Sequence, residues 1–222
     1  MSSAVGESIT FAVGVAISPL PIVAVLLMLL SQRSGANSVS LAIGWIVGVA
    51  VVLAATVAVA LAVGVTAHGQ VDHGTSTVRL VLGAALVLMG LRRLRAERQH
   101  PNPSPPRWLT TVEQAGPGRA AELGVALAAV NPKNLVLIIG GGLAIAEASA
   151  STGARIGAGA IFVALASVTV VLPVVVYAVA KSKAVPILAA WRDWLESHAQ
   201  ATVAVVLVVL GALLVGKGLG GF

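Results

Sequence analysis

The sequence predicts an all-α integral membrane protein, with six transmembrane helices as two inverted three-helix repeats and with proline-broken first and fourth helices. Three observations lead to this fold class. The chain is 58% hydrophobic and only 10% charged, it contains six long apolar segments, and landmarks of its first half return in its second half. A chain of this composition cannot bury its apolar groups in one water-soluble core, so it needs a lipid bilayer.

Each apolar segment is predicted to be a helix, because a chain in lipid must satisfy its backbone hydrogen bonds internally and these segments lack the alternation of barrel strands. About 20 apolar residues cross a hydrocarbon core of roughly 30 Å. The third segment is the weakest, since only Leu80 to Leu91 is free of charge, and its helix is expected to start near Gly74. The six segments are Ser8 to Leu30, Ser38 to Thr66, Thr77 to Leu91, Leu123 to Ala146, Ile156 to Ala180 and Ala199 to Gly216.

The two halves of the chain resemble each other. Residues 82–91 match residues 210–219 at seven of ten positions, and Ser18-Pro19 corresponds to Asn131-Pro132. Three crossings in each half invert the second half relative to the first, which is the plan of many secondary transporters. We expect a single membrane domain over residues 1–222, with repeat one at about 7–92, a basic, proline-rich cytoplasmic loop at about 93–120 and repeat two at about 121–219.

The basic residues predict the orientation. Ten would lie on one side of the membrane and three on the other, where Arg79, Arg155 and Lys217 are found. This asymmetry places the first side in the cytoplasm and both termini outside, in a multi-pass protein of the plasma (inner) membrane. The net charge of +6 then reflects topology and not nucleic-acid binding. The ten are Arg33, Arg92, Arg93, Arg95, Arg98, Arg107, Arg119, Lys181, Lys183 and Arg192.

A polar site is predicted where prolines interrupt two apolar segments. Pro19 and Pro21 lie about midway along the first segment, and Pro132 lies at a similar depth in the fourth. Proline removes a backbone donor and disturbs the preceding turn, so carbonyl groups become free and need partners within the membrane. The alternative is that these prolines only kink packed helices. The neighbouring side chains that can supply hydrogen bonds are Ser18, Asn131 and Asn134.

Lys133 is the only charged residue within the apolar cores of these segments. Counting from Leu123, it lies about 15 Å into its helix at ~1.5 Å per residue, near the middle of the bilayer. No Asp or Glu lies in an apolar core, so the sequence offers no counter-ion. The lysine is then uncharged through desolvation, lies in a water-filled cavity, bonds carbonyls freed by the prolines, or meets an anion of the substrate. We favour the last, a phosphate, sulfate or carboxylate.

Short motifs follow one another along the whole chain: Ser18-Pro19-Leu20-Pro21, Gly44-Trp45, Asn131-Pro132-Lys133-Asn134, Leu172-Pro173, Trp191-Arg192-Asp193-Trp194-Leu195 with His198, and Gly216-Lys217-Gly218-Leu219. Together they resemble the GAP family of actinobacterial glycolipid- or peptidoglycolipid-addressing proteins, also called sulfolipid-addressing proteins, of the lysine exporter superfamily. The resemblance implies a six-helix plasma-membrane protein that helps move envelope glycolipids outward. The superfamily also includes amino-acid exporters with a similar Asn-Pro-Lys motif, and thiol-based electron carriers, which a chain without cysteine cannot be.

We therefore expect a transporter or transport accessory that exports an amphipathic, anionic cell-envelope (glyco)lipid or its precursor. One alternative is an exporter of a small solute such as an amino acid, whose carboxylate would meet Lys133. A second is a non-transporting membrane scaffold for a lipid synthesis or export complex. The expected partners are membrane lipids, the anionic substrate, envelope-lipid synthesis or export proteins and a second copy of the chain.

An enzyme is not expected, and neither is a cofactor. The sequence has no motif for a nucleotide or an activated nucleophile, and its four histidines show no metal-binding spacing. The cluster Arg92, Arg93, Arg95 and Arg98 follows the third segment. Arginines just cytoplasmic of a helix attract anionic headgroups, but ordinary topology signalling explains the cluster equally well.

Overall fold

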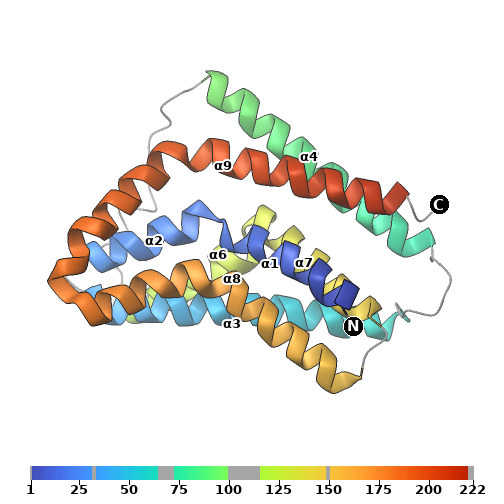
Figure 1. Ribbon diagram of the computed structural model, residues 1–222, viewed down its shortest axis with the longest axis horizontal. Helices are drawn as coiled ribbons and strands as arrows, with labels where there is room; N and C mark the ends of the chain where they lie inside the picture. Colours follow the sequence, from blue (N-terminus) through green and yellow to red (C-terminus); the bar gives the residue numbers. More distant parts are fainter. Residues whose placement is uncertain (1, 32–33, 65–72, 100–115, 149–150, 220–222) are drawn as a thin grey trace.

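The protein is described by a computed structural model over residues 2–31, 34–64, 73–99, 116–148 and 151–219. All the regular structure in these ranges is helical (Figure 1). The all-α prediction is thus confirmed. The elements are α1 (Ser2–Ala16), α2 (Pro19–Leu30), α3 (Ser34–Ala62), α4 (His73–Gln99), α6 (Pro117–Ala129), α7 (Pro132–Glu147), α8 (Thr152–Ala180), the 3₁₀ turn η1 (Lys181–Ala184) and α9 (Val185–Leu219).

Two of the predicted spans are broken helix pairs. The axes of α1 and α2 are bent by 50°, and those of α6 and α7 by 65°. Pro19 begins α2 and Pro132 begins α7. A proline fits the first turn of a helix, where a backbone N–H has no intrahelical partner, but it cannot continue the helix before it. The prolines therefore end one helix and start another, which is more than a kink.

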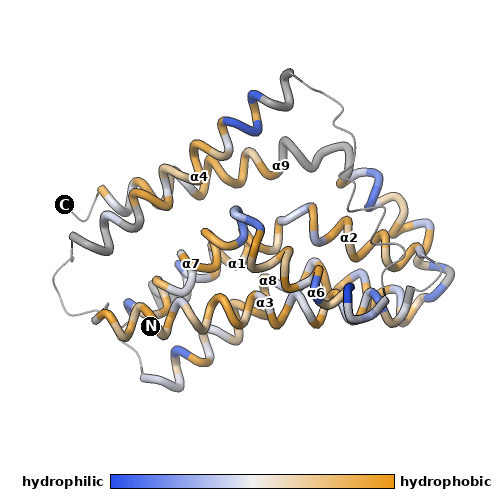
Figure 2. The backbone as a smooth tube through the Cα atoms, turned by 180° about the vertical axis from the view of Figure 1, so that it is seen from behind, coloured by the Kyte–Doolittle hydropathy of each residue, from blue (hydrophilic) through white to orange (hydrophobic). Residues whose placement is uncertain are grey.

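Two helices are long and apolar enough to cross a membrane, Gly35–Ala62 within α3 and Thr152–Ala180, which is α8. Each bent pair would add one span, so the described residues hold two to four candidate spans. The later part of α9, Val203–Gly216, is a shorter apolar stretch. The chain is accordingly a membrane protein. In Figure 2, α4 is largely apolar over its middle and becomes hydrophilic toward its C-terminal end.

The helices form a central group, with α4 and α9 packed against each other along one side of it (Figure 1). Glycines allow the close approach of α4 and α9. A Cβ atom added to Gly83 would lie 2.8 Å from the carbonyl oxygen of Gly211, and one added to Gly211 would lie 2.8 Å from that of Gly83. Likewise Gly90 faces Val208, and Gly218 faces Leu80. Small residues at such contacts are typical of helix packing in membranes.

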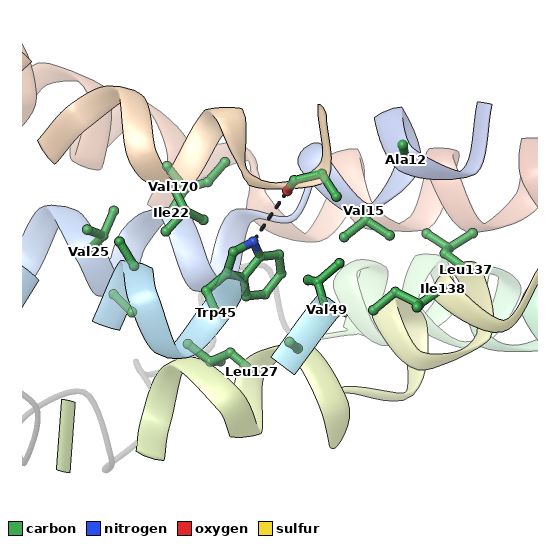
Figure 3. Packing of buried hydrophobic residues seen from close by; sticks show 14 of the residues in the cluster. Ala12, Val15, Ile22, Val25, Trp45, Val49, Leu127, Leu137, Ile138 and Val170 are labelled. Atoms are coloured by element: carbon green, nitrogen blue, oxygen red, sulfur yellow. Dashed lines mark hydrogen bonds between the residues drawn. The ribbon is translucent and has the colours of Figure 1, made fainter. Parts of the chain in front are cut away.

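The core of the central group surrounds Trp45 of α3, which is fully buried (Figure 3). Its indole Nε1 donates a hydrogen bond to the carbonyl oxygen of Ala166 in α8, at 3.3 Å. Beside it, Gly124 of α6 lies against the α3 backbone. The run 140–142 places glycines against three different helices, since Gly140 contacts Phe11 of α1, Gly141 contacts Phe162 of α8 and Gly142 contacts Thr56 of α3.

Two boundaries differ from the sequence prediction. Helix α4 starts close to the expected Gly74 but continues to Gln99, so the arginine cluster lies on a helix and not in the loop. Leu, Arg, Ala, Glu and Gln are good helix formers, which explains the extension. The motif around Trp191 and the sixth segment form one helical element, α9, instead of two. The proline-rich stretch from Pro101 to Pro106 lies outside the described residues.

Candidate functional site

The amine of Lys133 lies at the break between α1 and α2. Its Nζ donates hydrogen bonds to the carbonyl oxygens of Gly14 at 2.8 Å and Ile17 at 2.9 Å. The side chain is only 3% exposed. Lys133 therefore links the second half of the chain to the break in the first half, as expected from the paired proline motifs.

The prolines explain why these carbonyls are available. In a continuous helix the oxygen of Ile17 would accept from the backbone nitrogen of residue 21, but Pro21 has no N–H. The oxygen of Gly14 would accept from Ser18, whose extended backbone (φ −111°, ψ 105°) has left the helical path. Lys133 supplies the missing donors. As an ammonium it would also interact favourably with the negative C-terminal end of the α1 dipole.

A third carbonyl of the same break is satisfied by α8. The Thr169 hydroxyl donates to the oxygen of Ala16 at 2.7 Å. Sequence analysis did not select Thr169, because a lone hydroxyl in an apolar helix gives no distinctive signal. Ser18, which it did select, is 2% exposed and starts α2 without a side-chain cap hydrogen bond.

The break between α6 and α7 is closed within its own half of the chain. The Asn131 side chain accepts from the backbone N–H of Lys133 at 3.2 Å and so caps α7. The Asn134 amide nitrogen donates to the oxygen of Leu127 at 3.0 Å, while its Oδ1 is buried and has no hydrogen-bond partner among the described residues. Lys133, Asn131 and Asn134 thus gather around the two breaks, with Ser18 beside Ile17.

A long groove of about 1040 Å³ lies between α3 and α8, away from Lys133. Its lining is almost entirely apolar, and several lining side chains of α8 are well exposed on the outer surface, including Ile156, Val168, Leu172 and Val175. The polar residues that line it are Thr152, Arg155 and Ser167. Such a lining is chemically compatible with hydrocarbon.

Residues 9–220 match the family described as Sap, sulfolipid-1-addressing protein. The chain belongs to this family. The match confirms the family resemblance that the short motifs predicted, and it covers both breaks, the groove and the α4–α9 pair. Neither the curated proteins nor the solved structures contain a match to the chain.

In this sulfolipid-addressing family member the predicted arginine cluster lies on the C-terminal part of α4, and Arg93 is close enough to Lys133 for the two positive charges to repel each other. Arg92, Arg93 and Arg95 are near the C-terminal end of α4, where Arg92 and Arg95 are exposed and Arg93 is half-buried. The side chain of Arg98 lies outside the description. None of Arg92, Arg93 and Arg95 lines the groove.

Arg155 is a residue whose place the sequence did not reveal. In the sequence it contributes only to the charge asymmetry between the two sides of the membrane. In the structure its Nη2 donates to the oxygens of Ala146 at 3.4 Å and Ala148 at 3.1 Å, at the C-terminal end of α7. It also lines the α3–α8 groove. Its position next to the end of another helix depends on the fold and is not visible in a linear pattern.

Proposed function

We propose that this protein is a transporter, or a transport accessory, that moves an amphipathic, anionic cell-envelope (glyco)lipid or its precursor outward across the plasma membrane. Membership in a sulfolipid-addressing family supports a lipid role. The observation that carries the proposal is the apolar groove between α3 and α8, the two longest apolar helices, because its exposed lining is open to lipid.

The groove favours a lipid over a small anionic solute. An amino-acid exporter needs a water-filled cavity lined by polar groups, whereas the lining of the groove is almost entirely apolar. A lipid carrier needs an apolar surface between helices, which is what α3 and α8 offer.

Six spans in two inverted repeats remain our proposed architecture. The glycine contacts between α4 and α9 support it. Gly83 and Gly211 hold equivalent positions in the repeated segments, and each faces the other. The contact of Gly90 with Val208 has its equivalent in the contact of Gly218 with Leu80. Reciprocal contacts of this kind are expected at a two-fold axis. We further propose that α4 and α9 are the third and sixth spans.

The proposed orientation keeps both termini outside the cytoplasm. The start of α1, the end of α3, the start of α8 and the end of α9 lie toward one end of the molecule in Figure 1. The end of α4 and η1, which carry arginines and lysines, lie toward the other end. The excess of basic residues at that end supports a cytoplasmic assignment.

Within this proposal Lys133, Asn131, Asn134 and Ser18 form a polar site that the anionic headgroup meets near the middle of the membrane. An ammonium has three donors, and two carbonyl partners are recorded, which leaves one for a ligand. The buried Oδ1 of Asn134 offers an acceptor for a hydroxyl group. Transport without enzymatic chemistry would draw on an ion gradient, the lipid's own gradient or a partner protein.

The deciding experiment is lipid analysis of the cell surface in a strain that lacks the protein. Loss of one anionic surface lipid, with accumulation of that lipid inside the cell and recovery on complementation, is the expected result. An unchanged surface profile would reject export. Loss of the lipid's synthesis as well as its display would favour the scaffold alternative.

A further inference from the structure

We propose that the groove between α3 and α8 binds one anionic membrane lipid, with its negatively charged headgroup at Arg155 and its acyl chain along the apolar lining of α8. This inference rests on the proposed function and adds to it a binding site, separate from Lys133, at the extracytoplasmic end of the path.

Among the residues that the structure describes, Arg155 is the one charged residue that lines the groove. It is near the start of α8, and its Nη2 is held by the terminal carbonyls of α7. This holds the guanidinium in place at the mouth of the groove. A guanidinium has five N–H donors. Both hydrogen bonds described for Arg155 use Nη2, so the N–H groups of Nη1 remain for an anionic oxygen. Arginine matches phosphate, sulfate and carboxylate groups well.

The dimensions of the groove suit an acyl chain. From Arg155 to Val175 the axis of α8 rises about 30 Å at ~1.5 Å per residue, which is the thickness of a hydrocarbon core. The groove volume of about 1040 Å³ is at the upper end of the range typical of ligand sites. A headgroup at Arg155 would sit at the membrane surface, with its chain directed toward the midplane.

Ser167 gives an independent indication of a ligand. It lines the groove, is 3% exposed, and its hydroxyl has no partner among the described residues. It lies about 18 Å along α8 from Arg155, again at ~1.5 Å per residue. Hydrocarbon offers a buried hydroxyl no hydrogen bond, so a lipid oxygen that enters the groove would satisfy it. Ser167 thus marks a second polar position for the headgroup, deeper in the groove.

The test uses the purified full-length protein in mixed micelles with equal amounts of phosphatidylglycerol and phosphatidylcholine, and native mass spectrometry counts the retained lipids. We expect about fivefold enrichment of phosphatidylglycerol, the effect of one basic residue facing an anionic headgroup. Arg155→Gln should abolish the enrichment and Arg155→Lys should keep most of it. Arg192→Gln is the control, because Arg192 pairs with Asp193 and does not line the groove.

A second pair of variants tests the acyl-chain position. Ala164 lines the groove and is exposed, whereas Ala178 is exposed on the same helix outside the groove. Ala164→Trp should fill the groove and remove the retained lipid, and Ala178→Trp should not. Full enrichment in Arg155→Gln, its loss in Arg155→Lys, or equal lipid retention in the two tryptophan variants would overturn the inference.

The two proposals can fail separately. Lipid selection by the purified protein does not depend on export in cells, so an unchanged surface profile in the deletion strain would reject export and leave the binding site standing. If Arg155→Gln does not fold because the end of α7 loses its hydrogen bonds, the comparison of Ala164→Trp with Ala178→Trp still tests whether the groove binds the lipid.

Discussion

Replacing Lys133 with methionine separates two roles of the lysine. The amine holds the carbonyls of Gly14 and Ile17, at 2.8 and 2.9 Å, so Lys133→Met leaves two buried acceptors without donors. Hydrogen bonds between helices in membranes are worth about 0.6 kcal/mol on average and at most about 1.7. Leaving both carbonyl oxygens without donors should therefore lower the free energy of unfolding of the inserted protein by about 1–3 kcal/mol.

Removing the positive charge of Lys133 should affect the insertion of the helix into the membrane more than the packing of the inserted helices. An inserted but unfolded helix already holds its lysine in the membrane, so most of the desolvation penalty of Lys133 falls on insertion and not on packing. The methionine side chain would relieve that penalty, and expression should hold or improve. From the sequence alone, stability would be expected to hold if the lysine served the substrate and to fall if it bonded carbonyls freed by the prolines. The two carbonyl contacts favour a fall in stability.

The assay is unfolding in mixed micelles with increasing sodium dodecyl sulfate, followed by the fluorescence of the four tryptophans, together with surface-lipid analysis of the complemented deletion strain. Lys133→Gln is the informative partner, because its amide keeps two donors and removes the charge. If it regains stability but not export, the charge serves the substrate. If it regains both, Lys133 only closes the break and the substrate role is refuted. Wild-type stability in Lys133→Met would refute the carbonyl argument itself.

Three further outcomes are expected. In intact cells a membrane-impermeant thiol reagent should label Gly153→Cys and not Gly118→Cys. Both positions are exposed and have open space for a side chain. The reverse labelling pattern would invert the proposed orientation. Gly83→Ala should lower the free energy of unfolding by about 1–3 kcal/mol, because the added methyl group overpacks against the α9 backbone. Gly157→Ala is the control, since nothing lies within 4 Å of its added Cβ atom. Equal stability of the two variants would argue against the α4–α9 contact. Asn131→Ala should lower stability by about 1 kcal/mol by removing the α7 cap, and Asn131→Asp should retain it, as measured by the same unfolding titration.

The sequence was sufficient for the parts of the fold that depend on local chemistry. Apolar segments indicated the helices, and Pro19 and Pro132 indicated the breaks, because the missing N–H acts wherever the residue stands. The sequence did not reveal how sharply the chain bends just before Lys133. A count along a straight helix from Leu123 does not apply, because the helix ends before Asn131 and turns by 65°.

The contacts of the site were not predictable to the same degree. Asn131 capping α7 follows from a local sequence rule. The partners of Lys133, Thr169 and Arg155 lie on other helices, so they depend on how the helices pack. The groove has no motif at all, since it arises from the spacing of two helices whose apolar residues look alike in the sequence.

The two breaks are similar in sequence but are closed in different ways, and this difference predicts which helices move. Leu20 stands where the second half has Lys133, so the break in the first half depends on an amine from α7, while Asn134 serves its own half. Separating α7 from α1 would leave two backbone carbonyls in the membrane without hydrogen-bond donors, so we expect these helices to move as one body. Helices α3 and α8 line the groove, and we expect them to separate. Their hydrogen bond from Trp45 to Ala166 is less costly to break, because Ala166 lies inside the continuous helix α8 and not at a helix break. A cross-link made by a bifunctional thiol reagent between cysteines at positions 11 and 140 should leave export intact, whereas one between positions 53 and 159 should stop it. The opposite pattern would contradict this assignment.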